Sequence, residues 1–475
     1  MAQKKPEYIS LFVNIGLLLL CVLMLVIIPM LRYDINLHVG EESYLNLRIS
    51  EHLRIYDNFS FGGRSSVYAL GLPFILSYLP IFLVNMLPLI FGVFSFLLFW
   101  RLLNYYNING RKWIMLLLAI SPPFIYLFSS LNNCFVAIFL ALFGLYMVEQ
   151  KNKLAMSLGI FAFTVMPLFN FVISLIVAIL LILFAFFKTK HKGHIFLTLG
   201  LMGGVAAIYY GYLGYLSGNS MNIGFSFEKL GINAKLMYLF SDLGGKFGIA
   251  IFSLVLFIFG LIKVWKNKYK DLFVFFSVVI LLILVFFRSE TIFLLNLFIV
   301  IFSVQGFYYL YNKDWANNLL KKFTIFILIC GLLFSTLAFL KISVDEQPTA
   351  EIMDALKSLE IQRNGVVFTH PSRGILMNYV GKGNVMDNNY YFAPDVYGRW
   401  DDMQNLYYTR DINEALDIIN KYNIKYIWVD DSFEKEIWGH DEDGLLFLLK
   451  YSPYFKTIYN QGGIRIWSVI GSGSN

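Results

Sequence analysis

A charged segment stands directly behind the first long apolar run of this chain, and its residue types could do chemistry. The segment runs from Arg32 to Arg48 and holds the carboxylates Asp34, Glu41 and Glu42. Charged groups are costly to hold at a bilayer surface, so their presence there indicates a function. Carboxylates accept protons or bind cations, and arginine pairs with phosphate oxygens, so this segment suits chemistry on a lipid-linked phosphate.

The composition indicates a membrane protein around this segment. Of the 475 residues, 58% are hydrophobic, 18% are aromatic and only 15% are charged. The first 340 residues therefore cannot form a water-soluble globule. The net charge of +7 comes largely from short basic loops, so it reports orientation in the membrane and not binding to nucleic acid. Membrane lipids are the expected surroundings.

Apolar runs and basic loops together predict the topology. Loops rich in Lys and Arg are expected in the cytoplasm. Eleven apolar runs are long enough to cross a membrane, which puts the N-terminus inside and the C-terminus outside the plasma membrane. The predicted spans are 9–31, 84–103, 113–129, 134–149, 154–168, 169–187, 195–216, 247–265, 272–287, 291–311 and 323–340. The segment 67–83 contains two prolines and is expected to lie along the outer interface.

The character of the chain changes near Val344, where polarity becomes ordinary and turn residues become frequent. Val366–Thr369 and Tyr426–Val429 read as buried strands, and Ile412–Tyr422 has the apolar spacing of a helix. We therefore predict a transmembrane domain over 1–343 with an outer catalytic loop at 32–83. An extracytoplasmic α/β domain is predicted over 344–470, followed by a flexible tail at 471–475.

The outer loop also predicts a helix. Leu45, Ile49, Leu53 and Tyr56 recur at four-residue steps, which is typical of an amphipathic helix lying in the membrane interface. Glu41 and Arg48 are seven residues apart and would share one face of that helix, whereas Glu42 would share a face with Asn46. A carboxylate and a guanidinium could then converge on one substrate, although such charges can also merely solvate a surface helix.

Five short motifs give the chain a resemblance to a known family. Gly40–Arg48 (GEESYLNLR), Tyr56–Arg64 (YDNFSFGGR) and Leu70–Phe74 (LGLPF) resemble the first outer loop of GT-C membrane glycosyltransferases. The likeness is strongest to the oligosaccharyltransferase catalytic subunit and its archaeal relatives. Phe286–Glu290 (FFRSE) resembles the family's arginine near the outer end of a late span, and Val385–Asn389 (VMDNN) resembles part of its outer tail domain.

The resemblance implies a reaction and roles for residues. It implies a mainly α, GT-C-like membrane protein that moves a sugar from a polyprenyl-phosphate-linked donor to a glycan, lipid or protein acceptor, with inversion at the anomeric carbon. Glu42 takes the family's acidic position, with Glu41 and Asp34 as rivals, as base or as ligand of Mg²⁺ or Mn²⁺. Asn46 and Arg48 match the family's Tyr-x-His/Asn-x-Arg pattern. Arg288 and Arg48 would pair with phosphate oxygens.

Departures from the family leave alternatives open. The family's Trp-Trp-Asp-x-Gly acceptor motif is replaced here by Phe368–Gly374 (FTHPSRG), and its second acidic loop by Ser129–Asn133 (SSLNN). Transfer to a hydroxyl is therefore favoured over transfer to asparagine, as in a true oligosaccharyltransferase. A lipid or solute transporter and an inactive scaffold are the other readings. All of these assignments need the charged loop to meet Arg288 in one wet crevice on the outer side.

Overall fold

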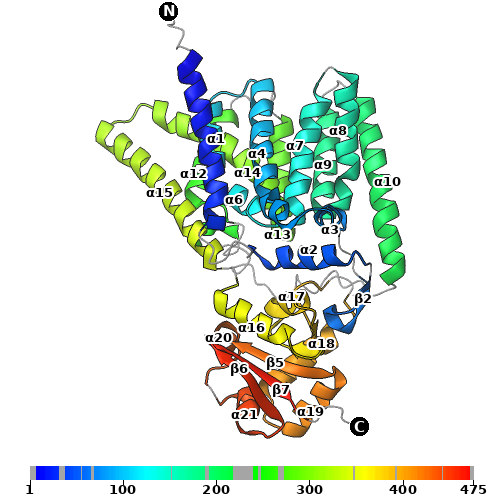
Figure 1. The fold of residues 1–475 in the computed structure, drawn as a ribbon. Helices are drawn as coiled ribbons and strands as arrows, with labels where there is room; N and C mark the ends of the chain where they lie inside the picture. The colour runs from blue at the N-terminus through cyan, green and yellow to red at the C-terminus, as the bar shows by residue number, and fades with distance from the viewer. Residues whose placement is uncertain are drawn as a thin grey trace, which may run out of the picture.

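The structure is a computed structural model in which a bundle of helices stands above a smaller unit built on a β-sheet (Figure 1). It describes residues 7–30, 38–54, 56–65, 69–150, 152–187, 192–217, 239–243, 248–265, 272–345, 348–390, 393–440 and 442–470. The flexible tail predicted at 471–475 lies outside these residues. The start of α1 and the sheet lie at opposite ends of the molecule (Figure 1).

Helices form within every range predicted to cross the membrane. The bundle consists of α1 (Glu7–Met30), α4 (Ile81–Tyr105), α5 (Arg111–Ala119), α6 (Pro122–Leu127), α7 (Asn133–Val148), α8 (Lys153–Val165), α9 (Phe171–Phe187), α10 (Lys192–Ser217), α12 (Ile251–Trp265), α13 (Leu272–Phe287), α14 (Thr291–Asn312) and α15 (Asn318–Asp345). The span predicted as one piece at 113–129 is divided between α5 and α6. Pro122 has no backbone N–H to continue α5, and it starts α6 instead.

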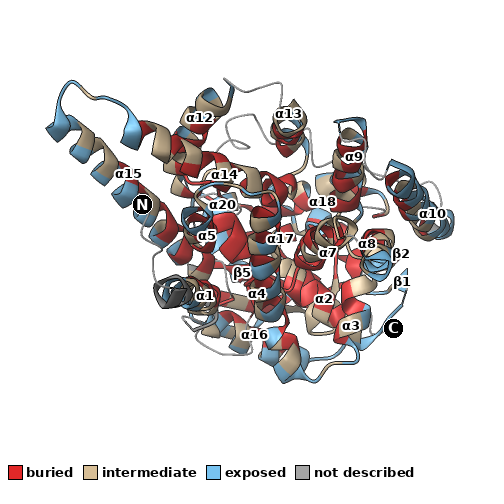
Figure 2. Cartoon of the chain, turned by 90° about the horizontal axis from the view of Figure 1, so that it is seen from above, coloured by how far each residue is buried: buried red, intermediate tan, exposed pale blue. Residues whose placement is uncertain are grey.

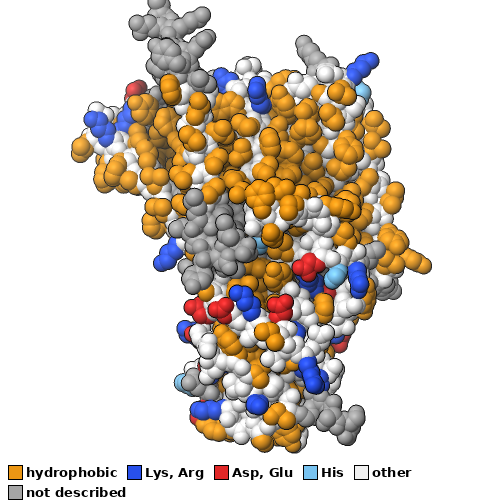
Figure 3. Space-filling view, in the orientation of Figure 1, with side chains coloured by type: hydrophobic (Ala, Val, Ile, Leu, Met, Phe, Trp, Pro, Cys, Tyr) orange, Lys and Arg blue, Asp and Glu red, His pale blue; other side chains and the backbone are white. Residues whose placement is uncertain are grey.

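Four of the described helices are long and apolar enough, by length and composition, to cross a membrane. They are Ile81–Tyr105, Lys192–Leu216, Thr291–Asn312 and Asn318–Val344. Hydrophobic side chains cover the helical part of the surface, and Lys and Arg gather at its edge far from the sheet (Figure 3). These features indicate an integral membrane protein. The number of eleven crossings stays a prediction.

The C-terminal unit is a five-stranded mixed sheet with helices on both faces. Its strand order is β4-β3-β5-β7-β6, in which β3 pairs in parallel with β4 and β5, while β7 is antiparallel to β5 and β6. The predicted strands and helix in this region are confirmed as β3, β5 and α19. The elements are β3 (Val366–Phe368), β4 (Gly383–Asn384), β5 (Ile424–Asp430), β6 (Phe455–Gln461), β7 (Ile464–Val469), α16 (Ala350–Glu360), α17 (Pro371–Tyr379), α18 (Val396–Tyr408), α19 (Ile412–Lys421), α20 (Asp431–Ile437) and α21 (Gly444–Tyr451).

The helix predicted in the outer loop is α2 (Glu41–Glu51), but its surroundings differ from the prediction. It ends before Leu53, and Tyr56 belongs to the short strand β1 (Tyr56–Asp57). Tyr44, Leu45 and Ile49 pack with apolar residues of α16, α17 and the sheet. The apolar face of α2 is thus covered by the C-terminal unit and not by lipid, because the sheet unit lies directly beneath this helix (Figure 1).

The segment expected along the outer interface contains the short helix α3 (Gly71–Leu76), which packs against α2 and α7. Gly71 allows α3 to approach the 3-10 turn Met166–Leu168 closely, because a Cβ atom on Gly71 would lie 2.7 Å from the carbonyl oxygen of Leu168. In the view from above, buried residues concentrate around α2, α17 and the central helices, while α10 and α15 show exposed sides at the periphery (Figure 2).

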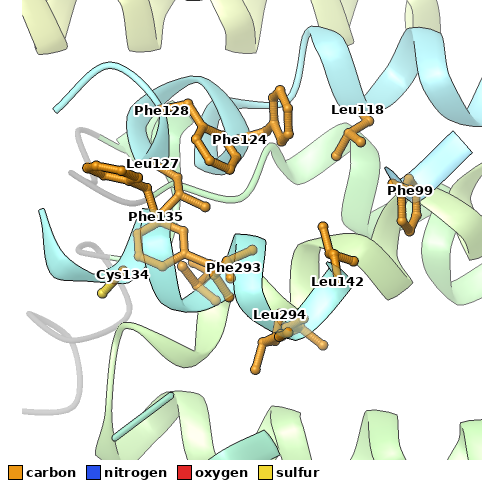
Figure 4. Close-up of a cluster of buried hydrophobic side chains, with 14 of the residues drawn as sticks. Phe99, Leu118, Phe124, Leu127, Phe128, Cys134, Phe135, Leu142, Phe293 and Leu294 are labelled. Atoms are coloured by element: carbon orange, nitrogen blue, oxygen red, sulfur yellow. The ribbon is translucent and has the colours of Figure 1, made fainter. Parts of the chain in front are cut away.

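The core of the bundle lies directly above α2. Aromatic and aliphatic side chains from α4, α5, α6, α7 and α14 meet there, among them Phe99, Leu118, Phe124, Phe135 and Phe293 (Figure 4). Phe135 and Cys134 stand at the first turn of α7, and Phe293 stands at the first turn of α14. The starts of α7 and α14 are therefore brought to the same level of the bundle.

The crossing of α12 and α14 depends on two glycines and gives a test of the fold. A Cβ atom on Gly306 would lie 1.9 Å from the carbonyl oxygen of Leu256, and one on Gly260 would lie 1.9 Å from that of Phe302. Gly306→Ala should therefore destabilise the protein by about 1–3 kcal/mol, because the backbones must separate. Thermal unfolding in detergent would measure this. Gly204→Ala on α10 meets no atom within 4 Å and should be near neutral; equal effects of both changes would contradict the packing argument.

Candidate functional site

The two adjacent carboxylates of the outer loop stand in the first turn of α2, between the bundle and the sheet. Gly40 precedes them with φ of +76°, a backbone conformation that glycine adopts without strain. Carboxylates in the first turn are favoured by the positive end of the helix dipole. The two side chains leave the helix in different directions, so Glu41 and Glu42 have different partners.

Glu42 faces the bundle and binds the loop before α7. Its Oε1 accepts a hydrogen bond of 3.0 Å from the backbone N–H of Asn133, the first residue of α7. Asn46 donates from Nδ2 to the carbonyl oxygen of Leu131 at 2.8 Å, and Ser43 Oγ accepts from the Leu131 N–H at 3.0 Å. The prediction that Glu42 and Asn46 share a face is confirmed. This face of α2 therefore holds the loop before α7.

Glu41 faces the C-terminal unit. Its Oε2 accepts from Nδ2 of Asn388 at 3.3 Å. Burial, followed by the charges of Asp387 and Glu41, raises the pKa of Tyr390 to about 12. Tyr390 thus stays a neutral hydrogen-bonding group near Glu41 at physiological pH. Asp34, the third carboxylate predicted for the site, lies outside the described residues.

Arg48 is bound to Asp57, which corrects the expected convergence of Arg48 with Glu41. Its Nη1 donates to Oδ1 of Asp57 at 2.9 Å, and its Nη2 donates to Oδ2. The exposed fractions of these side chains are 9% and 12%. Burial alone would raise the pKa of Asp57, but the charge of Arg48 and hydrogen bonds from Arg48 and two backbone N–H groups outweigh it and lower the pKa. The pair holds the hairpin that follows α2.

Arg288 and Glu290 stand in the turn between α13 and α14. Burial raises the pKa of Glu290, while the nearby positive charge of Arg288 opposes this effect. Glu290 Oε2 is buried and has no hydrogen-bond partner. An isolated carboxylate oxygen in such surroundings is costly, and it can be satisfied by a cation or by a proton. The turn therefore offers one guanidinium and one carboxylate at the start of α14.

Cys134 is a buried thiol in the first turn of α7. The charges of Glu290 and Glu42 both act on this buried thiol. Asn170, just before α9, donates from Nδ2 to its sulfur at 3.3 Å. Glu42 is hydrogen-bonded to the residue before Cys134, and the turn with Glu290 precedes α14, whose first turn packs in the same core as Phe135. That Arg288 and the carboxylates line one wet crevice stays a prediction.

Four buried side-chain oxygens, on α2 and at the starts of α7 and α14, have no hydrogen-bond partner. They are Asn46 Oδ1, Asn133 Oδ1, Glu290 Oε2 and Thr291 Oγ1. Within the described ranges, no group of three or more His, Cys, Asp or Glu side chains could hold a metal ion. The available donors are therefore two carboxylates supplemented by neutral oxygens, which suit hard cations better than zinc.

Residues that the sequence analysis did not single out also hold this region together. Asp57 binds Arg48, and Arg64 pairs with Asp387 across the junction to the sheet unit. Asp57 and Arg64 stand inside the Tyr56–Arg64 motif, and Asp387 stands inside Val385–Asn389. The motifs were therefore visible, but nothing in the sequence showed which of their residues pair across more than 300 positions.

Comparisons with known proteins give solved structures with the same fold. A scan of protein-family models finds no match, and a search of curated proteins finds none that matches. The oligosaccharyltransferase of Archaeoglobus fulgidus in its apo form is similar over 93% of this chain and 72% of its own, with 12% identity and a TM-score of 0.58. The enzyme AglB from that organism, in complex with an inhibitory peptide and a dolichol-phosphate, is similar over 95% of this chain and 73% of its own. The identity is 12% and the TM-score is 0.59.

Two further crystal structures of the Archaeoglobus fulgidus oligosaccharyltransferase match as well. One is a complex with Zn and sulfate, similar over 95% of this chain and 73% of its own, with 12% identity and a TM-score of 0.55. The other is tethered to an acceptor peptide containing the NVT sequon. It is similar over 96% of this chain and 74% of its own, with 13% identity and a TM-score of 0.54. The chain thus has a GT-C fold. Within that class, its fold is that of the oligosaccharyltransferases, as the resemblance predicted.

The Arg48–Asp57 pair gives a test of how the outer loop is held. Asp57→Asn should destabilise the protein by about 3 kcal/mol, because Arg48 is left buried without a counter-charge. The folded pKa of Asp57 lies below the usual value of about 3.9. Its contribution is therefore present above that pH and is lost as pH falls through the folded pKa.

The measurement is thermal unfolding of both proteins in detergent from pH 7 to pH 3. The difference between them should stay constant down to about pH 5 and shrink below about pH 4. Asp417→Asn, on the exposed side of α19, is the control and should have little effect. A difference that did not depend on pH would contradict the charge argument.

Proposed function

We propose that this protein is a membrane glycosyltransferase that moves a sugar or glycan from a polyprenyl-phosphate-linked donor to an acceptor on the extracytoplasmic side. One observation carries the proposal: Glu42 stands between the bundle and the sheet unit and is hydrogen-bonded to the first residue of α7, within an oligosaccharyltransferase-like fold. The relative solved with a dolichol-phosphate and the relative solved with sulfate support a phosphate-containing donor.

The chemistry follows from what each group can do. The acceptor oxygen attacks the anomeric carbon, the new C–O bond forms, and the bond to the phosphate oxygen breaks with its electron pair leaving on the phosphate. Glu42 takes the acceptor proton, and attack opposite the leaving group inverts the anomeric carbon. Arg288 stabilises the departing phosphate. Arg48, paired with Asp57, and Asn46, hydrogen-bonded to Leu131, hold α2, which carries Glu42.

A divalent cation is part of this proposal. Glu42 and Glu290, with the amide oxygens of Asn46 and Asn133, are the residues that would hold Mg²⁺ or Mn²⁺, since these ions prefer carboxylate and carbonyl oxygens. Three of those side chains have a buried oxygen without a partner, namely Asn46, Asn133 and Glu290. When bound, the cation would supply positive charge that neutralises the departing phosphate. One relative was solved with Zn, which is compatible with a divalent ion.

A second candidate function is transfer to asparagine of a protein, as in a true oligosaccharyltransferase. It is favoured by the relative tethered to a peptide with the NVT sequon. We prefer a hydroxyl acceptor, because Phe368–Gly374 lacks the family's peptide-reading motif and an amide is a poor nucleophile. Assays that offer a sequon peptide and a glycan or lipid acceptor side by side would separate the two.

The orientation in the membrane is part of this proposal. The N-terminus would lie in the cytoplasm and the sheet unit outside the plasma membrane, because Lys and Arg gather at the bundle edge remote from the sheet (Figure 3). Mass spectrometry of lipid-linked sugars and surface glycans, with and without the protein, tests the function as a whole. An unchanged glycan profile would overturn it in favour of a transporter or scaffold.

Replacing Glu42 tests the proposed base. Glu42→Gln keeps the shape and the acceptor oxygen but cannot take a proton, so kcat for sugar transfer should fall about 100-fold or more. Transfer by the reconstituted protein from a polyprenyl-phosphate donor is the measurement. Glu51→Gln, at the exposed end of the same helix, is the matched control and should keep its activity. Full activity of Glu42→Gln together with loss in Glu41→Gln would move the role to Glu41.

Replacing Arg288 tests the phosphate contact. Arg288→Ala should raise the donor KM and lower kcat, together about 100-fold in kcat/KM, and Arg288→Lys should recover only part of this because lysine lacks the planar fork. The control is Arg54→Ala, an exposed arginine in the segment after α2. Unchanged donor kinetics in Arg288→Ala would show that Arg288 only anchors the helix end.

A further inference from the structure

The hairpin after α2 inserts one side chain into the core of the C-terminal unit. Phe61, in the short 3-10 helix Ser60–Gly62, has only 1% of its surface exposed. It belongs to the same buried cluster as Phe368, Val385 and Met386 of the sheet unit. A residue of the outer loop is thus part of a core that is otherwise built by the last quarter of the chain.

The backbone at this insertion is held in an unfavourable conformation. Phe61 has φ of +54°, and the two following residues, Gly62 and Gly63, have φ of +69° and +114°. A bulky residue in the left-handed region persists only where its surroundings fix it. Here the Phe61 N–H donates to Oδ1 of Asn384 at 2.9 Å, and the Asn384 N–H donates to the carbonyl oxygen of Phe59 at 3.0 Å.

A buried ion pair closes the same junction. Asp387, 1% exposed, accepts from Ser60 Oγ at 2.5 Å and from Asn384 Nδ2 at 3.2 Å through Oδ2. Its Oδ1 accepts from the Asn389 N–H at 2.8 Å and from Arg64 Nη2 at 3.4 Å. Arg64 also donates from Nη1 to the Asn389 carbonyl oxygen. Both carboxylate oxygens are therefore satisfied, which is the condition under which a buried charge is tolerated.

Two guanidinium groups complete the enclosure of Phe61. The Cζ atoms of Arg64 and Arg399 lie 4.9 Å and 5.7 Å from the centre of its ring. Arg399 also donates to the carbonyl oxygen of Val385 at 3.0 Å. Contacts between cations and an aromatic ring are strengthened where water is excluded. Phe61 is thus held by charge as well as by packing.

The segment that holds the hairpin also reaches the catalytic helix. Asn384, Asp387 and Asn389 bind the hairpin, whereas Asn388, between them, donates to Glu41 at 3.3 Å. Glu41 adjoins Glu42 in the first turn of α2. One short segment of the C-terminal unit therefore binds the outer loop at two places, the start of α2 and the hairpin beyond it.

We propose that Asn384–Asn389 is a positioning element that sets the first turn of α2, and with it Glu42, so that the sheet unit takes part in assembling the transfer site. This inference rests on the proposed function only for its kinetic consequence. Asp387 acts through Ser60 and Arg64, and Asn388 acts through Glu41; neither residue needs to touch the substrate.

The first test replaces Asn388, which is exposed and can change without disturbing the core. Asn388→Asp places a second carboxylate beside Glu41 and should speed amide hydrogen exchange in the peptide covering 40–46 about threefold to tenfold. It should lower kcat for transfer by a similar factor while the donor KM stays within twofold. Asn388→Gln keeps the donor group and should behave like the wild type. Asn460→Asp, an exposed asparagine on β6, is the control for added charge.

The second test replaces Asp387. Asp387→Asn leaves Arg64 without its counter-charge and should raise exchange about 100-fold across α2 and the hairpin, with kcat falling at least tenfold. Glu434→Gln breaks the ion pair with Arg465 inside the sheet unit and should leave the exchange of α2 unchanged. Both are measured on the full chain in lipid nanodiscs.

Hydrogen exchange of α2 tests the positioning role, and transfer by the wild-type protein tests the proposed function. Unchanged exchange of α2 in Asn388→Asp and Asp387→Asn would overturn the positioning role whatever the activity. Faster exchange with unaltered kcat would also overturn it, because the contact would then only stabilise the fold. A wild-type protein without any transfer would overturn the proposed function, while the exchange data would still decide whether Asn384–Asn389 holds α2.

Discussion

The structure depends on α2 being bound on two sides at once. One side, with Glu42, Ser43 and Asn46, is hydrogen-bonded to the loop that begins α7. The other side, with Tyr44 and Leu45, packs into the core of the sheet unit. An eleven-residue helix is too short to be stable by itself in water, so these contacts hold its carboxylates in place.

Holding carboxylates at this level requires compensation from several elements. The carboxylate of Glu42, on α2, lies at the start of α7, where the backbone N–H groups and the helix dipole favour a negative charge. Glu290 stands at the start of α14 with Arg288 two residues before it. The charged groups therefore belong to different segments, and the starts of two helices bring them to one level. This arrangement is consistent with chemistry that needs both a base and positive charge for a leaving phosphate.

Sequence reasoning reached the architecture because its signals are local. Long apolar runs predict helices, and strand patterns such as Tyr426–Val429 predict a buried sheet, since burial on both faces requires continuous apolar residues. It placed Glu42 and Asn46 on one face, because four residues make about one helical turn. It was wrong about what packs against the apolar face of α2, because an apolar stripe has the same pattern whether lipid or protein lies against it. It missed the break at Pro122 within one apolar run.

What the sequence determined by itself is therefore the identity of the chemical groups and the kind of element that carries each: acidic and basic residues in the loop after the first apolar run, apolar helices, and a C-terminal α/β unit. Only the tertiary structure decided the partners. Arg48 could face Glu41 by spacing, yet it pairs with Asp57, and Phe61 enters a core formed by residues more than 300 positions away. Such pairings depend on how rigid elements pack in space, and periodicity along a chain carries no information about contacts between distant segments.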